Sequence, residues 1–344
     1  SERDYWEKTA EIVKDAPSTL KMILPEVYLE DADVTDRIAK IQQSMKEYLA
    51  ADIFAEYKNA MVYIERIQSD GKMRAGLIGK IDLEQYDYSK GSVSPVRATE
   101  ATVPERIPPR VRIRRGASLE LPHIMILIDD PDRLVLEPLQ EKKAALRKLY
   151  DFDLMMNGGH LAGWAVESEE DLDAVSSAMR ALKDRLGPDP MLLAVGDGNH
   201  SLATAKAYWN EIRETLSEKE REDHPARFAL CEIVNIHDEA LLFEPIHRVI
   251  TGVSSELLLQ SWAAYASTRG MTLSDSGEGH SFTAVTVSGD RKIVVGSPEG
   301  AIPTETIQKF LDSFLAEHAE ADIDYIHGDD SLRSLVTKDT VTGF

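Results

Sequence analysis

Apolar side chains recur every three or four residues in several segments of the chain, which is the spacing of an amphipathic helix. The most regular segment, residues 172–186, follows Ser168 and Asp171 at the spacing of a capping box and ends before Gly187 and Pro188. This segment therefore predicts a complete helix with defined N- and C-termini. The same spacing predicts further helices at residues 38–49, 202–216, 257–265 and 307–315.

Short runs of β-branched or apolar residues predict the strands of a sheet. They cover residues 61–67, 77–83, 124–128, 191–195, 228–236, 282–287 and 292–295. The last two flank Ser288-Gly-Asp and so predict a hairpin. Because helices and strands mix without strict alternation, we predict an α+β fold, a mixed sheet with packed helices. We place a boundary near Gly252, between a main α+β domain of residues 1–251 with the candidate site and a smaller C-terminal α+β unit of residues 252–344.

The composition is that of an ordinary folded protein with an acidic surface. Of the 344 residues, 43% are hydrophobic and 29% are charged, which excludes collagen, disordered chains and disulfide scaffolds. The 39 basic and 60 acidic residues give a net charge of −21, which disfavours nucleic-acid and membrane partners. The single cysteine, Cys231, lies in an apolar run and predicts a buried side chain. With no signal peptide at the start and no apolar run of ~18 residues, we expect a cytoplasmic protein.

The most informative stretch is residues 191–206, Met-Leu-Leu-Ala-Val-Gly-Asp-Gly-Asn-His-Ser-Leu-Ala-Thr-Ala-Lys. A predicted strand runs into a turn with two glycines, and a helix opens near Ser201. This arrangement directs backbone N–H groups and the positive end of a helix at the turn, which favours a phosphate or a carboxylate. The alternative is an ordinary turn followed by a helix cap. The candidate residues of the turn are Gly196, Asp197, Gly198, Asn199, His200 and Ser201.

Other polar side chains stand beside glycines or at predicted strand ends. Gly158 and Gly159 let a ligand approach the backbone beside His160, although a hairpin tip with a solvated histidine explains this equally well. Farther along, Arg248 suits a phosphate or carboxylate and His247 titrates near neutral pH, or both pair with surface acids. Because sites assemble from several element ends, we expect four of these side chains to converge on the pocket of the turn. They are His160, Asn235, His247 and Arg248.

A proline-rich stretch and an acidic pair complete the candidates. The prolines of residues 90–115 predict a long loop with no regular element. Five of its arginines form either a patch for an anionic substrate or pairs with surface acids, and they are Arg106, Arg110, Arg112, Arg114 and Arg115. Asp129 and Asp130 precede a proline at a strand end, which suits either a magnesium ion or a turn. The chain has no CxxC, HExxH or GxSxG motif, so dedicated zinc and serine-hydrolase sites have no support.

Five motifs follow one another along nearly the whole chain. They are Gly-Leu-Ile-Gly-Lys-Ile-Asp-Leu-Glu-Gln-Tyr-Asp at residues 76–87, Thr-Glu-Ala-Thr at 99–102, Tyr-Asp-Phe-Asp with Gly-Gly-His at 150–160, the turn and helix at 196–206, and Asn-Ile-His with Pro-Ile-His-Arg at 235–248. In this order they resemble the bacterial domain-of-unknown-function family numbered 1015. The resemblance implies a leading segment before Ser1 and names no activity.

The turn is also similar, more distantly, to the Asp-Gly-His-His-Arg motif of ADP-dependent free-serine kinases, in the superfamily of the ParB amino-terminal domain and sulfiredoxin. In this match Asp197 stands for the aspartate, Asn199 and His200 for the histidines, and Ser201 for the arginine. The asparagine and the serine depart from the motif, so the charge of the arginine has to come from another side chain. The resemblance implies ADP or ATP with Mg²⁺ as the cofactor, whereas the residues themselves name neither cofactor nor metal.

From these observations we predict an enzyme that acts on a small phosphorylated or carboxylated metabolite, by phosphoryl transfer on an amino acid such as serine or phosphoserine. Asp197 or His200 acts as general base toward a hydroxyl. Lys206 and Arg248 neutralise the phosphate, and Glu100 holds an amino group or a metal. The alternatives are a metabolite- or nucleotide-binding regulatory protein without turnover, and a ParB-like nucleic-acid binder that the charge disfavours. Whether the chain forms a homo-oligomer is left open by the sequence.

Overall fold

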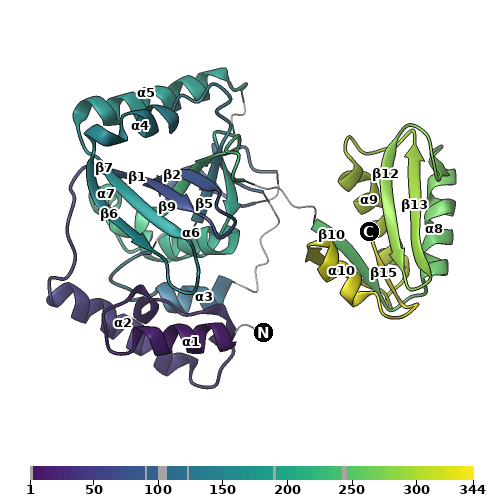
Figure 1. Ribbon diagram of the computed structural model, residues 1–344, viewed down its shortest axis with the longest axis horizontal. Helices are drawn as coiled ribbons and strands as arrows, with labels where there is room; N and C mark the ends of the chain where they lie inside the picture. Colours follow the sequence, from purple (N-terminus) through teal and green to yellow (C-terminus); the bar gives the residue numbers. More distant parts are fainter. Residues whose placement is uncertain (1–2, 90, 100–106, 122–123, 189–190, 242–245) are drawn as a thin grey trace. The chain divides into compact units, whose positions relative to one another are not determined.

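The computed structural model describes residues 3–89, 91–99, 107–121, 124–188, 191–241 and 246–344 (Figure 1). The chain divides into two compact units, Ser1–Leu241 (unit 1) and Leu242–Phe344 (unit 2). The predicted boundary at Gly252 falls after strand β10 (Ile246–Thr251), which pairs within the sheet of unit 2. Among the described residues, no helix has the length and apolar character that crossing a bilayer requires.

A mixed sheet of nine strands organises the described part of unit 1, in the order β3-β4-β8-β5-β9-β2-β1-β7-β6. The strands are β1 (Met61–Ile67), β2 (Met73–Asp82), β3 (Tyr86–Asp87), β4 (Val96–Ala98), β5 (Ile124–Ile128), β6 (Arg147–Asp153), β7 (His160–Val166), β8 (Leu193–Asp197) and β9 (Phe228–Asn235). Strands β3, β4 and β8 run parallel, as do β5 and β9, while β5 runs antiparallel to β8. The predicted α+β class with a mixed sheet is therefore confirmed.

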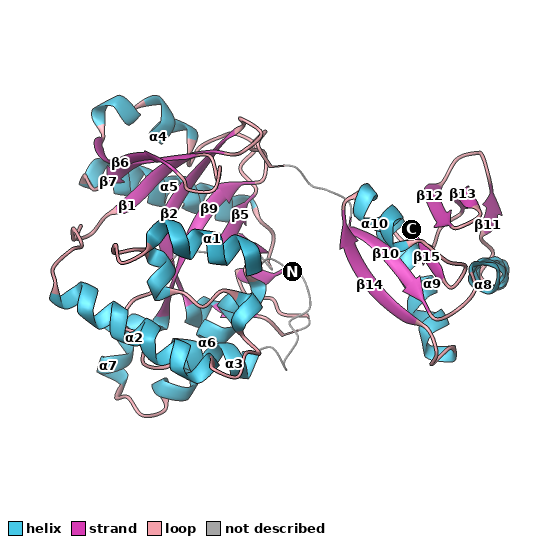
Figure 2. Cartoon of the chain, turned by 60° about the horizontal axis from the view of Figure 1, so that its bottom comes forward, coloured by secondary structure: helices cyan, strands magenta, loops and turns pink. Residues whose placement is uncertain are grey.

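Helices lie on both sides of this unit. They are α1 (Arg3–Val13), α2 (Val34–Ala50), α3 (Ile107–Arg114), α4 (Glu137–Glu141), α5 (Glu169–Arg185), α6 (Asn199–Arg213) and α7 (Glu218–Asp223), with short 3₁₀ segments at Thr19–Met22, Glu26–Tyr28, Leu83–Gln85, Lys143–Ala145 and Pro225–Arg227. Figures 1 and 2 show α4 and α5 grouped on one side and α2, α3 and α6 on the other. The predicted helix after Ser168 is α5, and the Ser168 hydroxyl accepts the backbone N–H of Asp171 as an N-cap.

The proline-rich stretch contains a helix, so the prediction of a loop with no regular element is wrong. Helix α3 begins at Ile107, and Pro108 and Pro109 occupy its first turn. A first-turn residue needs no intrahelical N–H bond and proline already has a helical φ, so the two prolines favour the start of a helix there.

Two separate apolar clusters stabilise unit 1. The larger lies on the sheet and joins Tyr63, Leu77, Ile126 and Cys231 to helix residues such as Trp209, all buried. The smaller joins the first 3₁₀ segment to α2, and consists of Met22, Ile41 and Met45 with partly buried neighbours. Helix α2 and the first 3₁₀ segment therefore pack around a core of their own.

Unit 2 is a six-stranded antiparallel sheet with three helices among its described residues. Its strands follow the order β11-β13-β12-β15-β10-β14. Besides β10 they are β11 (Thr272–Ser274), β12 (His280–Thr286), β13 (Gly289–Gly296), β14 (Asp322–His327) and β15 (Val341–Gly343), with helices α8 (Ser255–Thr268), α9 (Pro303–Glu317) and α10 (Asp329–Leu335). Strands β12 and β13 form the predicted hairpin, and Trp262 stacks on Phe310 at its core.

Candidate functional site

Strand β8, a glycine turn and helix α6 follow one another as predicted. Gly198 has a φ of 87°, in the left-handed region that glycine adopts readily, and it is the N-cap of α6. Because this residue carries no side chain, the N-cap residue itself supplies no oxygen to the first N–H groups of the helix. The Oδ1 atom of Asp197 accepts the N–H of Gly198 at 2.7 Å. The helix thus begins at Asn199, before the expected start near Ser201, and Ser201 lies in its first turn.

Thr99 lies against this turn, at the end of the parallel neighbour β4. Its hydroxyl donates to the carbonyl oxygen of Val195 at 2.5 Å, and the side-chain nitrogen of Asn199 lies 3.5 Å from the same hydroxyl. Asn199 is buried. The Thr-Glu-Ala-Thr motif and the glycine turn, distant in sequence, therefore meet here, although Glu100 lies outside the described residues. Thr99 is therefore a residue of the candidate site that its sequence motif alone did not reveal.

The side chains of the turn differ in exposure. Asp197 is exposed, whereas His200 and Ser201 are half-buried. Gly196 is restricted by its neighbour, since a Cβ atom there would lie 2.8 Å from Cγ of Leu127 on β5. A carboxylate at the surface and an imidazole near a helix start are groups that can take up or release a proton from a bound substrate.

Lys206 is held away from the turn. It lies about two turns into α6, or roughly 10 Å from the helix start, and its ammonium group donates to the carbonyl oxygen of Leu83 at 2.7 Å. Burial lowers the pKa of this ammonium group. Glu84 beside it accepts the indole N–H of Trp209 at 2.5 Å and the guanidinium of Arg213 at 3.1 Å. These contacts anchor α6 to the motif at residues 76–87, which is a structural role.

Four of the five arginines named for the proline-rich stretch lie among the described residues and have partners in unit 1, as the second interpretation of that stretch proposed. Three form ion pairs with acids and one bonds to a hydroxyl. The pairs are Arg110 with Glu26, Arg114 with Glu120, Arg115 with Glu211, and Arg112 with the hydroxyl of Thr35. Arg106 lies outside the described residues. These contacts join α3 to its neighbours and favour the surface-pair interpretation over an anion-binding patch.

His160 lies on a different part of the sheet. It begins β7, and β5, β9, β2 and β1 stand between β7 and β8, a separation on the order of 20 Å. Both ring nitrogens bond to carboxylates, Nδ1 to Asp153 and Nε2 to Asp151, each at 2.7 Å. The bonds to Asp153 and Asp151 raise the pKa of His160. The structure therefore does not bring His160 to the turn.

Asn235 ends β9 on the opposite edge of the sheet from Asp197, because β9 is parallel to β5 and β5 is antiparallel to β8. Its buried amide donates to the carbonyl oxygen of Asp130 at 2.8 Å. One oxygen of the buried Asp130 carboxylate accepts the backbone N–H groups of Leu134 and Val135, which is a turn. Within the described ranges, no group of three or more His, Cys, Asp or Glu side chains could hold a metal ion. Asp130 thus fits the turn interpretation.

His247 and Arg248 belong to β10 in unit 2. Both line a cavity of about 370 Å³ in that unit. The guanidinium of Arg248 bonds to Gln308 at 3.3 Å and lies over the ring of Tyr325, and burial lowers its pKa. The two residues therefore share a cavity with each other, and their convergence with His200 stays a prediction.

Comparison with known proteins identifies a family and no activity. A family model described as "Protein of unknown function (DUF1015)" matches residues 2–314. No curated protein and no solved structure matches the chain.

Proposed function

The chain belongs to the DUF1015 family of proteins of unknown function, and we propose that it is an enzyme that binds a small phosphorylated or carboxylated metabolite at the β8–α6 turn and transfers a phosphoryl group on it. The observation that carries the proposal is the start of α6, where the N-cap residue is a left-handed glycine, Gly198, which has no side chain of its own, and Asp197 beside it is exposed. The first backbone N–H groups and the dipole of a helix favour a negative charge at such a place.

The neighbouring side chains suit a hydroxyl acceptor. Asp197 is exposed to solvent and one of its oxygens already accepts the N–H of Gly198, which orients the carboxylate. We assign it as the general base that removes the proton from the hydroxyl of the acceptor, with His200 as the second candidate. Thr99 positions the turn through Val195.

The amino acid serine is the acceptor that the distant similarity to free-serine kinases suggests, with ADP or ATP and Mg²⁺ as the phosphoryl donor. In this proposal the phosphate lies at the start of α6, where the backbone and not an arginine supplies the charge complement. Asn199 and Ser201 replace a histidine and the arginine of that motif, so we expect weaker nucleotide affinity than the full motif provides.

A second candidate, a binding protein without turnover, draws on one observation. Lys206 donates to the carbonyl oxygen of Leu83 and lies about two turns from the helix start, so it is poorly placed to neutralise a transferring phosphoryl group. The backbone N–H groups at the start of a helix are sufficient to bind a carboxylate or phosphate, even where no lysine side chain reaches the anion.

Turnover and binding are tested separately on the same protein. Purified protein is offered serine or phosphoserine with ADP or ATP and Mg²⁺. The products measured are AMP where ADP is the donor, ADP where ATP is the donor, and phosphate where phosphoserine is hydrolysed, and affinity for each ligand is measured by calorimetry. We expect Asp197→Asn to lower the rate by ~10²–10⁴-fold and to change affinity much less. The matched control is Asp184→Asn, an exposed aspartate on α5, which should leave both quantities unchanged.

The outcomes separate the two candidates. Turnover that falls in Asp197→Asn and not in Asp184→Asn supports the enzyme. Saturable binding of phosphoserine or nucleotide without turnover supports the binding protein. Absence of both binding and turnover with all four ligands contradicts the assignment of the turn as a phosphate site.

A further inference from the structure

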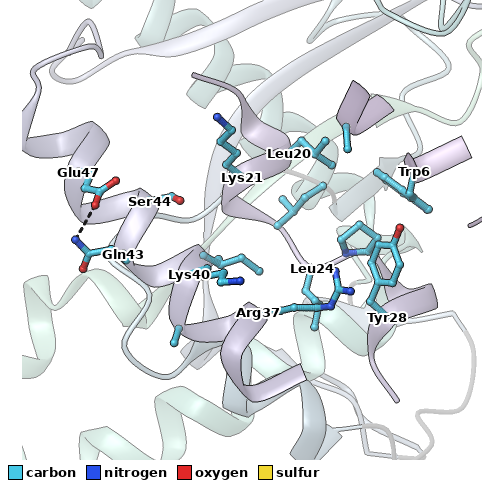
Figure 3. Close-up of a pocket in the computed structure, with 15 residues that line it drawn as sticks. Trp6, Leu20, Lys21, Leu24, Tyr28, Arg37, Lys40, Gln43, Ser44 and Glu47 are labelled. Carbon is cyan, nitrogen blue, oxygen red and sulfur yellow. Dashed lines mark hydrogen bonds between the residues drawn. The ribbon is translucent and has the colours of Figure 1, made fainter. Parts of the chain in front are cut away.

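A second cavity lies in the amino-terminal part of unit 1, apart from the β8–α6 turn. It has a volume of about 730 Å³, within the range of sites that take small molecules. Its lining residues come from α1, from the 3₁₀ segments Thr19–Met22 and Glu26–Tyr28, and from α2 (Figure 3). None of the residues of the β8–α6 turn lines it.

One side of the cavity is apolar and aromatic. Trp6, Leu20, Leu24 and Tyr28 line it, and Figure 3 shows Trp6 and Tyr28 on the same side. The cavity lies over the separate core cluster described above, to which Leu24 also belongs. A preformed core of this kind holds the cavity wall in place when a ligand enters.

Three basic side chains also line the cavity, Lys21 next to Leu20 and Arg37 and Lys40 on α2 (Figure 3), which is unexpected in a chain with 60 acidic and 39 basic residues. Arg37 is held by Asp33, from Nε to Oδ1 at 2.9 Å, and its guanidinium lies 4.3 Å from the centre of the Tyr28 ring. By contrast, within the described ranges no carboxylate forms an ion pair or a hydrogen bond with the ammonium group of Lys21 or Lys40. Two ammonium groups without an acidic partner beside an apolar wall favour a ligand that brings its own negative charge.

The acidic residue of the lining does not neutralise these lysines. Glu47 accepts the side-chain amide of Gln43 at 2.8 Å, one turn apart on α2 (Figure 3). Figure 3 places Lys40 on the α2 side of the cavity, with Leu24 and Trp6 across from it. A ligand that spans this distance would meet an apolar surface at one end and a positive charge at the other.

We propose that this cavity binds an organic anion with an apolar body, such as an aryl or alkyl carboxylate or sulfonate. The body packs against Trp6, Leu20 and Leu24, and the anionic group lies at the ammonium group of Lys40. Apolar contact supplies most of the affinity and Lys40 supplies the selection for an anion. The proposal does not depend on the function assigned to the β8–α6 turn.

The probe for the test is 8-anilinonaphthalene-1-sulfonate, compared with N-phenyl-1-naphthylamine, which has the same aromatic body and no charge. Binding is followed by calorimetry and by the fluorescence of the protein. Trp6 is the reporter, because the other tryptophans, Trp164, Trp209 and Trp262, are buried. We expect one saturable sulfonate site that quenches Trp6, and weaker binding of the neutral probe.

Substitutions on α2 then test which ammonium group contacts the sulfonate. Lys40→Gln should weaken binding of the sulfonate by about fivefold or more, on the scale of one charged contact, and leave the neutral probe unaffected. Lys46→Gln is the matched control, since Lys46 is an exposed lysine of the same helix outside the lining. Trp6→Leu should abolish the quenching.

Three results would overturn the proposal. They are the absence of saturable binding, equal affinity for the charged and neutral probes, and an equal loss of sulfonate affinity in Lys40→Gln and Lys46→Gln. Both lysine variants change exposed side chains, so unchanged unfolding temperatures are expected and provide the check that each variant is folded.

Discussion

The hydroxyl of Thr99 donates to the carbonyl oxygen of Val195 at 2.5 Å, and this bond joins the end of β4 to a fully buried residue of β8. The two strands are parallel neighbours, so their carboxyl ends leave the sheet at the same edge. Two motifs about a hundred residues apart in the sequence thus meet at the candidate site.

Replacing Thr99 with valine should lower the free energy of unfolding by about 1–2 kcal/mol, because it leaves a buried carbonyl oxygen without its donor. Urea denaturation measures the change. The control is Thr215→Val, whose hydroxyl donates to the carbonyl oxygen of Ile212 in an exposed position, and a change within about 0.5 kcal/mol is expected there. Equal losses in the two variants would contradict the role given to Thr99.

The contact of Glu84 with α6 predicts a loss of stability in acid. Burial alone would raise the pKa of Glu84, but the hydrogen bonds from Trp209 and Arg213 outweigh it and hold the pKa below its usual value. A carboxyl whose pKa is lower in the folded state stabilises the protein above its unfolded pKa, about 4.3, and this contribution disappears as the pH falls through the folded value.

The measurement is the unfolding free energy of the wild type and of Glu84→Gln between pH 6 and pH 3. We expect the variant to be less stable at pH 6 and the difference between the two proteins to shrink toward pH 3. A difference that stays constant over this interval would show that the glutamate stabilises by packing and not by charge.

His160 predicts a pH dependence of the opposite sign. Hydrogen bonds to Asp153 and Asp151 raise its pKa, so the protonated imidazole stabilises the fold fully below the unfolded pKa of about 6.5. This contribution is lost as the pH rises through the higher folded value. The unfolding temperature of the wild type should therefore fall relative to that of His160→Gln between pH 6 and pH 9. Parallel curves for the two proteins would contradict this assignment.

Local patterns predicted the elements that depend on near neighbours in the sequence. The regular apolar spacing of α5 and the capping position of Ser168 are of this kind, as is the glycine turn before α6. Strand β6 was missed because it lies at the sheet edge with mostly exposed residues, and its alternation of apolar and polar residues is only four residues long, Tyr150 to Asp153. Helix α3 was missed because its prolines, taken from the sequence alone, indicate a break in a helix. Proline breaks a helix only in its interior and favours a helix when it lies in the first turn.

The candidate site shows the same limit. The turn at Asp197 was identified from adjacent residues, but its separation from Asn235 depends on the directions of β8, β5 and β9, which no single segment encodes. Likewise, the spacing along α6 places Lys206 on the helix without revealing that its ammonium group donates a hydrogen bond to the carbonyl oxygen of Leu83. Contacts between segments far apart in the sequence decide both questions.

Cys231 should be unreactive in the folded protein. Its side chain is fully buried, and burial raises the pKa of the thiol to about 12, so almost no thiolate exists at neutral pH. A disulfide reagent such as dithionitrobenzoate is expected to label one thiol per chain in urea and essentially none in the native state. Fast labelling under native conditions would contradict the burial of β9.

Gly198 provides the most direct test of the turn, because its φ of 87° is unfavourable for residues with a Cβ atom. Gly198→Ala should destabilise the protein by about 1–2 kcal/mol and weaken phosphoserine binding at the start of α6. Gly198→Asn should recover part of both, since asparagine tolerates the left-handed conformation. Gly187→Ala is the control, because a Cβ atom there meets no atom within 4 Å. If Gly198→Ala binds phosphoserine as tightly as the control variant, the backbone geometry at Gly198 does not contribute to the site.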